Sequence, residues 1–255
     1  MTELVSIIMP AYNCARFIRE SINSVLAQTY TAWELLIVDD CSTDNTAEVV
    51  DNYADSRIRY MRNEQNKGAA LSRNKALREA KGRYIAFLDA DDTWTHDKLE
   101  KQIAFMQQNG YTFTYTCYSE MDCEGQPTRV LVSGPSKITR LGMFAFCWPG
   151  CLTVMYDTKT IGMIQIEDIK KNNDYAMWLK ACQKADCYLL KENLASYRIG
   201  RTGSVSNHSI AILIKWHYRL FRNAEKMPIL PSLWHTCVNL IAGLYKKIRY
   251  RSKIA

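Results

Sequence analysis

Short apolar segments alternate with amphipathic segments over roughly the first hundred residues of the 255-residue chain. The apolar segments are rich in Val, Ile, Leu and Tyr and read, in order, VSIIMPAY, WELLIVDD, RIRYMRN and RYIAFLD. Helical periodicity between them predicts helices over about 15–28, 43–54 and 69–80. Strands that are apolar throughout and separated by helices are typical of a parallel sheet covered on both faces. The pattern therefore predicts an α/β fold with a mostly parallel central sheet.

Three of the predicted strands run directly into polar residues, at 10–13, 39–40 and 89–92. Because ligands of open α/β sheets bind beyond the carboxyl ends of the strands, we expect these segments to meet at one rim. The last segment, DADD, places three carboxylates in four positions, and their repulsion indicates a cation nearby. Oxygen clusters of this kind suit Mg²⁺ or Mn²⁺ shared with a diphosphate. The alternative is a solvated turn that caps the next helix.

Composition and charge exclude several classes of protein. The net charge is +7, and residues 212–255 alone hold nine Lys or Arg against one Glu. The rest of the chain is nearly neutral, so the body lacks the basic surface of a nucleic-acid-binding protein. Nine cysteines without a C-x-x-C pair are typical of reduced thiols in a cytosolic protein. The first residues show no secretory signal pattern, and we expect a cytoplasmic protein.

The pattern loosens after residue 110. Strand-like segments occupy about 111–122 and 151–157, a helix is predicted near 175–185, and the strand-like CYLLKE follows. No internal repeat interrupts this part of the chain. We expect it to form an α+β extension that covers the rim.

The end of the chain combines an amphipathic pattern with basic residues. A helix over 233–250 would carry these apolar side chains on one face: Leu233, Cys237, Ile241, Leu244 and Ile248, with Trp234, Val238 and Tyr245 alongside. The apolar stretch of about thirteen residues is too short to span a bilayer, which takes about twenty. An apolar face beside Lys and Arg fits a helix on an anionic membrane surface, here through residues 228–255 at the inner face of the cell membrane. The alternative is that this face packs against the body or a second subunit.

A set of motifs occurs in one order along the chain. The motifs are VSIIMPAYN, SVLAQTY, WELLIVDDCSTDNT, NKGAALSRNKAL, AKGRYIAFLDADDTW, NNDYAMWLK and YRIGRTGSVS. Together they resemble glycosyltransferase family 2, inverting enzymes with the Rossmann-like GT-A fold. The resemblance covers about residues 4–206. It implies a GT-A domain over 1–211, with a nucleotide-sugar-binding half at 1–110 and an acceptor-binding half at 111–211, before a basic amphipathic helical tail at 212–255.

The resemblance also implies which residues bind the donor. Pro10, Tyr12 and Asp40 match positions that hold the nucleotide, with the Tyr12 ring near the base and the Asp40 carboxylate accepting from a base N–H. Arg73 is expected to reach the donor as well. Asp39 either assists Asp40 or only caps the following turn.

Asp89 and Asp91 match the D-x-D element of the family. The resemblance implies that Asp91 ligates a divalent metal ion, Mn²⁺ or Mg²⁺, and that Asp89 lies near the donor ribose or the metal. Asp92 is expected to support this turn or to cap the next helix.

The segment YRIGRTGSVS departs from the family pattern, because Gly200 stands where a histidine often follows Y-R-x. Arg198, Arg201 and Ser204 are then expected to close over the donor diphosphate without a histidine metal ligand.

Asp174 is the candidate catalytic base. It lies in NNDYAMWLK, which resembles the E-D-Y or E-D-W signature of the family, although Asn173 takes the place of the usual glutamate. Inversion needs a carboxylate on the side of the sugar opposite the diphosphate, where it accepts the proton of the attacking hydroxyl.

The resemblance implies a metal-dependent inverting glycosyltransferase. It would move a sugar from a nucleotide-diphosphate donor, with UDP favoured, to a hydroxyl of a growing, lipid-linked glycan of bacterial surface polysaccharide, such as O-antigen or capsule. One alternative is a sugar nucleotidyltransferase, although such enzymes usually carry a glycine-rich loop where this chain has PAYNCARF. The other is a catalytically inactive glycan-binding or scaffold protein with the same fold.

Overall fold

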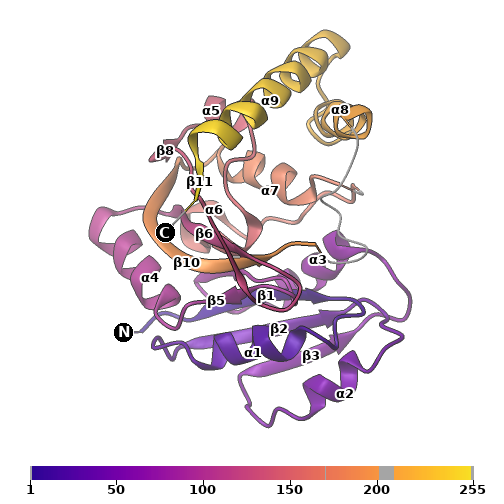
Figure 1. Cartoon of the computed structure of the whole chain (residues 1–255), viewed down its shortest axis with the longest axis vertical. Coiled ribbons are helices and arrows are strands. Elements are labelled where there is room, and N and C mark those ends of the chain that lie inside the picture. The colour runs from indigo at the N-terminus through magenta and orange to yellow at the C-terminus, as the bar shows by residue number, and fades with distance from the viewer. Residues whose placement is uncertain (1, 170, 201–209, 254–255) are drawn as a thin grey trace.

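One mixed sheet runs through the protein, with helices on both of its faces (Figure 1). The computed structural model describes residues 2–169, 171–200 and 210–253. The strands of the first half are β1 (Val5–Ala11), β2 (Trp33–Asp39), β3 (Ile58–Arg62) and β4 (Tyr84–Phe87). They are all parallel and lie in the order β4-β1-β2-β3, so their carboxyl ends share one edge of the sheet. The parallel sheet predicted for this half is confirmed.

The second half extends the sheet mostly with antiparallel strands. These strands are β5 (Thr93–Trp94), β6 (Phe113–Met121), β7 (Pro127–Val132), β8 (Lys137–Ile138), β9 (Met155–Asp157), β10 (Cys187–Arg198) and β11 (Arg251–Lys253). The path from β4 continues through β9, β6 and β7 to β11, and each of these pairs is antiparallel. The long β10 runs parallel to β6 and also pairs with β5 and β8. Because β5 follows the acidic turn, this pairing brings the end of β10 close to that turn.

The helices separate into groups by the core that they cover. They are α1 (Ile18–Leu26), α2 (Thr46–Asp51), α3 (Ala69–Glu79), α4 (Lys98–Asn109), α5 (Arg140–Ala145), α6 (Thr158–Ile161), α7 (Asn173–Ala181), α8 (Ile210–Arg219) and α9 (Ile229–Arg249). Side chains alternate across a strand, so Ile7 and Leu35 face the core under α1, α2 and α4. Ile8 and Leu36 face the opposite core, to which α3 and α7 contribute.

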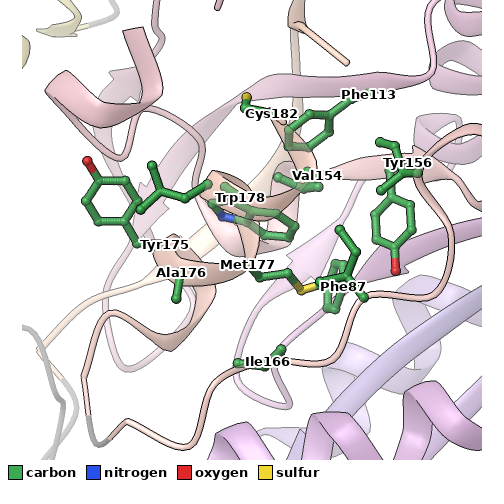
Figure 2. Close-up of a cluster of buried hydrophobic side chains, with 14 of the residues drawn as sticks. Phe87, Phe113, Val154, Tyr156, Ile166, Tyr175, Ala176, Met177, Trp178 and Cys182 are labelled. Carbon is green, nitrogen blue, oxygen red and sulfur yellow. The ribbon is translucent and has the colours of Figure 1, made fainter. Parts of the chain in front are cut away.

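Helix α7 is held on the sheet by aromatic packing (Figure 2). The ring centroid of Trp178 lies 5.3 Å from that of Phe87 and 5.8 Å from that of Phe113. Aromatic pairs at such distances contribute about 0.5–1.5 kcal/mol beyond their buried area. This packing fixes the position of the first turn of α7, where Asp174 lies.

The first two helices are shorter than predicted because side chains compete for backbone donors. The predicted helix at 43–54 is reduced to α2, since the Asp44 carboxylate accepts from the Thr46 N–H and from the Ala15 N–H. These bonds hold the chain in a turn before α2 and beside the start of α1. The helix predicted at 15–28 correspondingly begins at Ile18.

The strand predicted at 151–157 is wrong in its first half. Cys151–Thr153 form a 3₁₀ turn, and the strand is limited to β9. The Thr153 hydroxyl donates to the Gly150 carbonyl at 2.7 Å, and the Trp94 indole N–H donates to the Leu152 carbonyl at 2.8 Å. Hydrogen bonds from side chains to backbone carbonyls compete with the backbone hydrogen bonds that would continue the strand.

The C-terminal segment packs against the rest of the protein through a side of α9 that the hydrophobic pattern did not indicate. The helix places a stripe of small and polar residues toward the body: Ser232, Thr236, Asn239, Gly243 and Lys246. Asn239 donates to the Phe144 carbonyl at 3.0 Å, and a Cβ on Gly243 would lie 3.0 Å from the Phe146 ring. After the helix, β11 pairs with β7.

The predicted apolar face of this helix is exposed. Trp234, Ile241 and Ile248 retain 68%, 70% and 75% of their accessible surface. The alternative in which this face packs against the body is therefore wrong. None of the described helices is long and apolar enough to cross a membrane.

Gly82 allows the loop before β4 to approach β1 closely. A Cβ at this position would lie 2.5 Å from the Ser6 backbone nitrogen and 2.9 Å from the Leu4 carbonyl oxygen. The Gly82 N–H also donates to the Ser6 hydroxyl at 2.8 Å. The sequence position is therefore restricted to glycine by backbone contact.

Replacing Gly82 by alanine is expected to lower the free energy of unfolding by about 1–3 kcal/mol, because the new methyl group overlaps backbone that is fixed in the sheet. Urea denaturation measures the loss. Gly142→Ala, in α5, is the matched control, since its Cβ would lie 3.5 Å from the nearest atom, an ordinary contact distance. Equal losses in the two variants would contradict the explanation.

Candidate active site

A cavity of about 1160 Å³ opens at the carboxyl ends of β1, β2 and β4. The structure brings these predicted residues to its wall: Pro10, Tyr12, Asp40, Arg73, Asp89, Asp91 and Asp174. The opposite wall includes residues 149–152 and 171–174 from the second half of the chain. The rim expected from the strand ends thus exists, and both halves of the chain enclose it.

Asp40 fixes the loop that leads into α3. Its Oδ1 accepts from the Asn63 side chain and the Lys67 N–H, both at 2.8 Å, and its Oδ2 accepts from the Gly68 N–H at 2.7 Å. The carboxylate is nearly buried but still lines the cavity. Asp40 therefore holds residues 66–68 at the cavity wall, a contribution that the motif did not reveal.

Asp39 lies outside the cavity wall and supports the turn after β2. Its Oδ1 accepts from the Ser42 N–H at 2.9 Å, and its Oδ2 accepts from the Tyr60 hydroxyl at 2.6 Å. The side chain is fully buried. Of the two roles considered for Asp39, this geometry fits turn capping.

Arg73 connects the two walls of the cavity. One guanidinium nitrogen donates to Asp89 Oδ1 at 2.5 Å, and the other donates to Asn173 Oδ1 at 3.2 Å. Its Nε is buried and has no hydrogen-bond acceptor among the described residues. The guanidinium therefore joins the acidic turn after β4 to the first residue of α7.

Arg198 lies beside the acidic turn but outside the cavity wall. Its backbone N–H donates to Asp92 Oδ1, and its Nε donates to the Asp91 carbonyl, both at 2.8 Å. The remaining guanidinium nitrogens donate to Glu20 and to the carbonyls of residues 122–123. The arrangement gives Arg198 a role in holding the turn, and its contact with the donor stays a prediction. Arg201 and Ser204 lie outside the described residues.

Asp174 occupies the first turn of α7 with its carboxylate in the cavity. Its Oδ1 accepts from the Tyr175 N–H at 2.9 Å. Burial raises the pKa of the Asp174 carboxyl above its ordinary value, and the Asp89 charge adds to this shift, whereas Arg73 and the Tyr175 N–H oppose it. A raised pKa brings a carboxylate closer to the range in which it exchanges protons efficiently as a general base.

The acidic turn fits a divalent metal ion that is shared with phosphate groups. Among the described residues, no group of three or more His, Cys, Asp or Glu side chains could hold an ion alone. Mg²⁺ is commonly bound by one or two carboxylates and completed by substrate phosphates and water. Asp91, with Asp89 beside it, supplies oxygen donors of this kind at the cavity wall.

The cavity also contains residues that the sequence did not indicate. Tyr118 and Tyr197 line it as an edge-to-face pair with ring centroids 6.0 Å apart. Cys151 lies on the same wall, and Lys246 enters from α9. Tyr118 alternates with polar residues on the strand predicted at about 111–122, which offered a weak signal, and Tyr197 begins the motif YRIGRTGSVS. Lys246 stood in the predicted tail and offered no signal.

A family model described as "Glycosyl transferase family 2" matches residues 6–149, which is more than half of the chain. The chain belongs to glycosyl transferase family 2. A family-2 relative in Bacillus subtilis (strain 168), "Putative teichuronic acid biosynthesis glycosyltransferase TuaG", is 40% identical over 234 residues, 91% of this chain and 92% of the relative. An Escherichia coli relative, "UDP-Glc:alpha-D-GlcNAc-diphosphoundecaprenol beta-1,3-glucosyltransferase WfgD", is 40% identical over 223 residues, 84% of each chain. The protein is therefore a glycosyltransferase, as the motifs predict.

Solved structures share the fold of this family-2 enzyme. S. aureus TarS 1–349, in complex with UDP, superposes with a TM-score of 0.70 at 21% identity, over 96% of this chain and 73% of that chain. The mannosyltransferase PcManGT from Pyrobaculum calidifontis, in complex with GDP-Man and Mn²⁺, gives a TM-score of 0.67 at 16% identity, over 96% and 76%. These likenesses confirm the GT-A fold.

Removing the charge of Arg73 is expected to move the acid limb of the pH–rate profile to higher pH. A carboxylate acts as a base only in its charged form, and Arg73 lowers the pKa of the candidate base Asp174, so the loss of Arg73 leaves less of the charged form at a given acid pH. The measurement is kcat against pH for wild type and Arg73→Met. Arg73→Lys keeps the charge and serves as the control. Identical acid limbs in wild type and Arg73→Met would contradict this electrostatic coupling.

Proposed function

We propose that this family-2 enzyme transfers a glycosyl group, with inversion, from a nucleoside diphosphate donor to a hydroxyl of a lipid-linked glycan in bacterial surface polysaccharide synthesis. One observation carries the proposal: a single cavity holds the acidic pair Asp89 and Asp91 together with the partly buried carboxylate of Asp174, and Arg73 links their segments. The geometry supplies separate groups for the leaving diphosphate and for the attacking hydroxyl.

The donor half of the cavity suits a nucleotide. Tyr12 keeps 48% of its surface, so its ring is available to stack on a base, and Pro10 and Asp40 lie beside it on the wall. UDP is the favoured nucleotide, a choice supported by the UDP complex of TarS and by the UDP-Glc in the name of WfgD.

Asp91, with Asp89, would hold Mn²⁺ or Mg²⁺ against the donor diphosphate. When bound, such an ion offsets the negative charge that develops on the departing nucleoside diphosphate. The protein's own part is to keep the turn in place, through Arg73 on Asp89 and Arg198 on Asp92 and the Asp91 carbonyl. The Mn²⁺ in the PcManGT complex supports this assignment.

Asp174 acts as the base of the transfer. The acceptor hydroxyl attacks the anomeric carbon, a new C–O bond forms, and the bond from that carbon to the phosphate oxygen breaks. The electron pair of the broken bond leaves with the nucleoside diphosphate, and Asp174 accepts the proton of the acceptor hydroxyl. The Tyr175 N–H and the position at a helix N-terminus stabilise the carboxylate form before the reaction.

Two variants separate the donor groups from the base. Asp91→Asn is expected to lose metal-dependent UDP binding in calorimetry, because a neutral amide is a poor ligand for Mg²⁺. Asp174→Asn is expected to bind UDP as wild type does, and to lose about 10²- to 10⁴-fold in transfer rate. Wild type and both variants are assayed with UDP-sugars and with α-D-GlcNAc diphosphate carrying an alkyl chain.

Asp51→Asn, on the exposed surface of α2, is the matched control and should retain both properties. Full transfer by Asp174→Asn would exclude the base assignment. A wild-type enzyme that binds UDP and transfers to no acceptor would favour the catalytically inactive alternative.

We also propose that α8 and α9 contact an anionic membrane surface, where a lipid-linked acceptor resides. Figure 1 shows these two helices together at the end of the molecule remote from α1 and α2. Their exposed apolar residues include Ile210, Leu230, Trp234, Ile241 and Ile248. Exposed basic residues lie at the end of α9 and in β11: Lys247, Arg249, Arg251 and Lys253. Apolar insertion beside basic charge is the combination that holds helices on anionic bilayers.

The double variant Leu244→Gln/Ile248→Gln is expected to weaken membrane binding by roughly tenfold or more, because two large apolar side chains no longer leave water. Flotation of the full chain with phosphatidylglycerol-containing vesicles measures the effect, and neutral vesicles should bind less protein. Met163→Gln, at an exposed apolar position outside these helices, is the control. A double variant that floats like wild type would exclude this contact.

A further inference from the structure

Lys246, in the last turn of α9, lies in the wall of the catalytic cavity. Its Nζ donates to the Trp148 carbonyl at 2.6 Å and lies 5.5 Å from the centroid of the Phe146 ring. The side chain therefore crosses from the C-terminal helix to the segment that precedes residues 149–152 of the cavity wall. A residue assigned by sequence to a separate tail thus contributes to the active site.

The fold holds this lysine in place from both sides. Before it, Asn239 and Gly243 fix α9 against Phe144 and Phe146. After it, the Tyr250 carbonyl accepts from the Ser133 N–H at 2.8 Å, and β11 pairs with β7. Lys246 is thereby positioned by the sheet and by the helix packing, unlike the solvated lysine that follows it.

The Lys246 ammonium group is partly buried and has one hydrogen-bond acceptor among the described residues. Burial lowers the pKa of Lys246, while the nearby Cys147 and Asp174 act in the opposite direction. Of its three donors, one is used by the Trp148 carbonyl, and Lys246 forms no ion pair within the described part of the chain. A partly buried cation gains from a bound anion, because charge-assisted hydrogen bonds replace the hydration that it has lost.

The position of Lys246 separates it from the donor diphosphate. The donor groups Asp91 and Arg73 belong to the acidic turn and α3 in the first half of the chain, whereas Lys246 contacts the Trp148 carbonyl and the Phe146 ring in the second half. Asp174, the proposed base, also comes from the second half, and this places Lys246 on the acceptor side of the cavity. An acceptor linked to lipid carries a phosphate next to its sugar, within reach of a cation near the base.

We infer that Lys246 binds the phosphate of a lipid-linked acceptor and so places the acceptor sugar before the catalytic base. The inference rests on the proposed function. The acceptor in the name of WfgD, α-D-GlcNAc-diphosphoundecaprenol, has this chemistry. Leu244, Tyr245 and Ile248 on the same turns of α9 are exposed and offer apolar surface for an attached lipid chain.

Calorimetric titration of the full chain, loaded with UDP and Mg²⁺, tests this inference with two probes. One is α-D-GlcNAc diphosphate bearing an alkyl chain, and the other is the matching alkyl α-D-GlcNAc without phosphate. Lys246→Met is expected to raise the Kd of the diphosphate probe by roughly ten- to a hundredfold, the effect of losing a charged hydrogen bond. The Kd of the phosphate-free probe should stay unchanged.

Two further variants exclude a general structural effect. Lys246→Arg keeps the charge and should recover most of the affinity for the diphosphate probe, and Lys191→Met, at an exposed lysine of β10 outside the cavity, should bind both probes as wild type does. Equal losses of affinity for both probes in Lys246→Met, or no loss for either, would overturn the inference while leaving the proposed transfer intact. If Lys246→Met shifts the acid limb of the kcat–pH profile equally with both acceptors and leaves both Kd values unchanged, Lys246 instead adjusts the pKa of Asp174.

If wild type binds neither probe but still binds UDP, the lipid-linked acceptor of the proposed function fails, and the inference fails with it.

Discussion

The pairing of Arg73 with Asp89 is the interaction on which the cavity depends. Asp40, Asp89, Asp91 and Asp174 all line one concave surface, and carboxylates in such proximity destabilise one another's charged forms. The buried guanidinium offsets this repulsion, and its second contact, to Asn173, also joins the two halves of the chain. Without the Arg73 guanidinium, holding the acidic turn beside the start of α7 would cost free energy, because the carboxylates there would lose a nearby opposite charge.

Adjacent acidic residues have different roles at the ends of β2 and β4. Asp39 points into the network of Ser42 and Tyr60, whereas Asp40 reaches the cavity wall. Asp92 likewise accepts from the Arg198 backbone N–H. In each cluster, one carboxylate therefore stabilises the turn that presents its neighbour.

The C-terminal segment packs on the rest of the protein through α9 and pairs with the sheet through β11. Helix α9 packs through a stripe of small and polar residues, where Gly243 permits close approach and Asn239 makes a hydrogen bond to the body. This packing leaves the larger apolar side chains of α9 exposed beside the basic end of the chain. One helix therefore places Lys246 in the cavity wall and leaves its large apolar side chains exposed on another side.

The sequence by itself determined the parallel half of the sheet, the acidic turn and the candidate base, because these depend on local periodicity and on motifs with short spacing. The length of α2 and the turn before β9 escaped prediction, since Asp44 and Thr153 form hydrogen bonds that hydrophobic pattern does not encode. Only the tertiary structure decided the direction of Arg198 and the entry of Lys246 into the cavity. Both depend on contacts between segments far apart in the chain, where geometry and desolvation, rather than residue spacing, determine which groups meet.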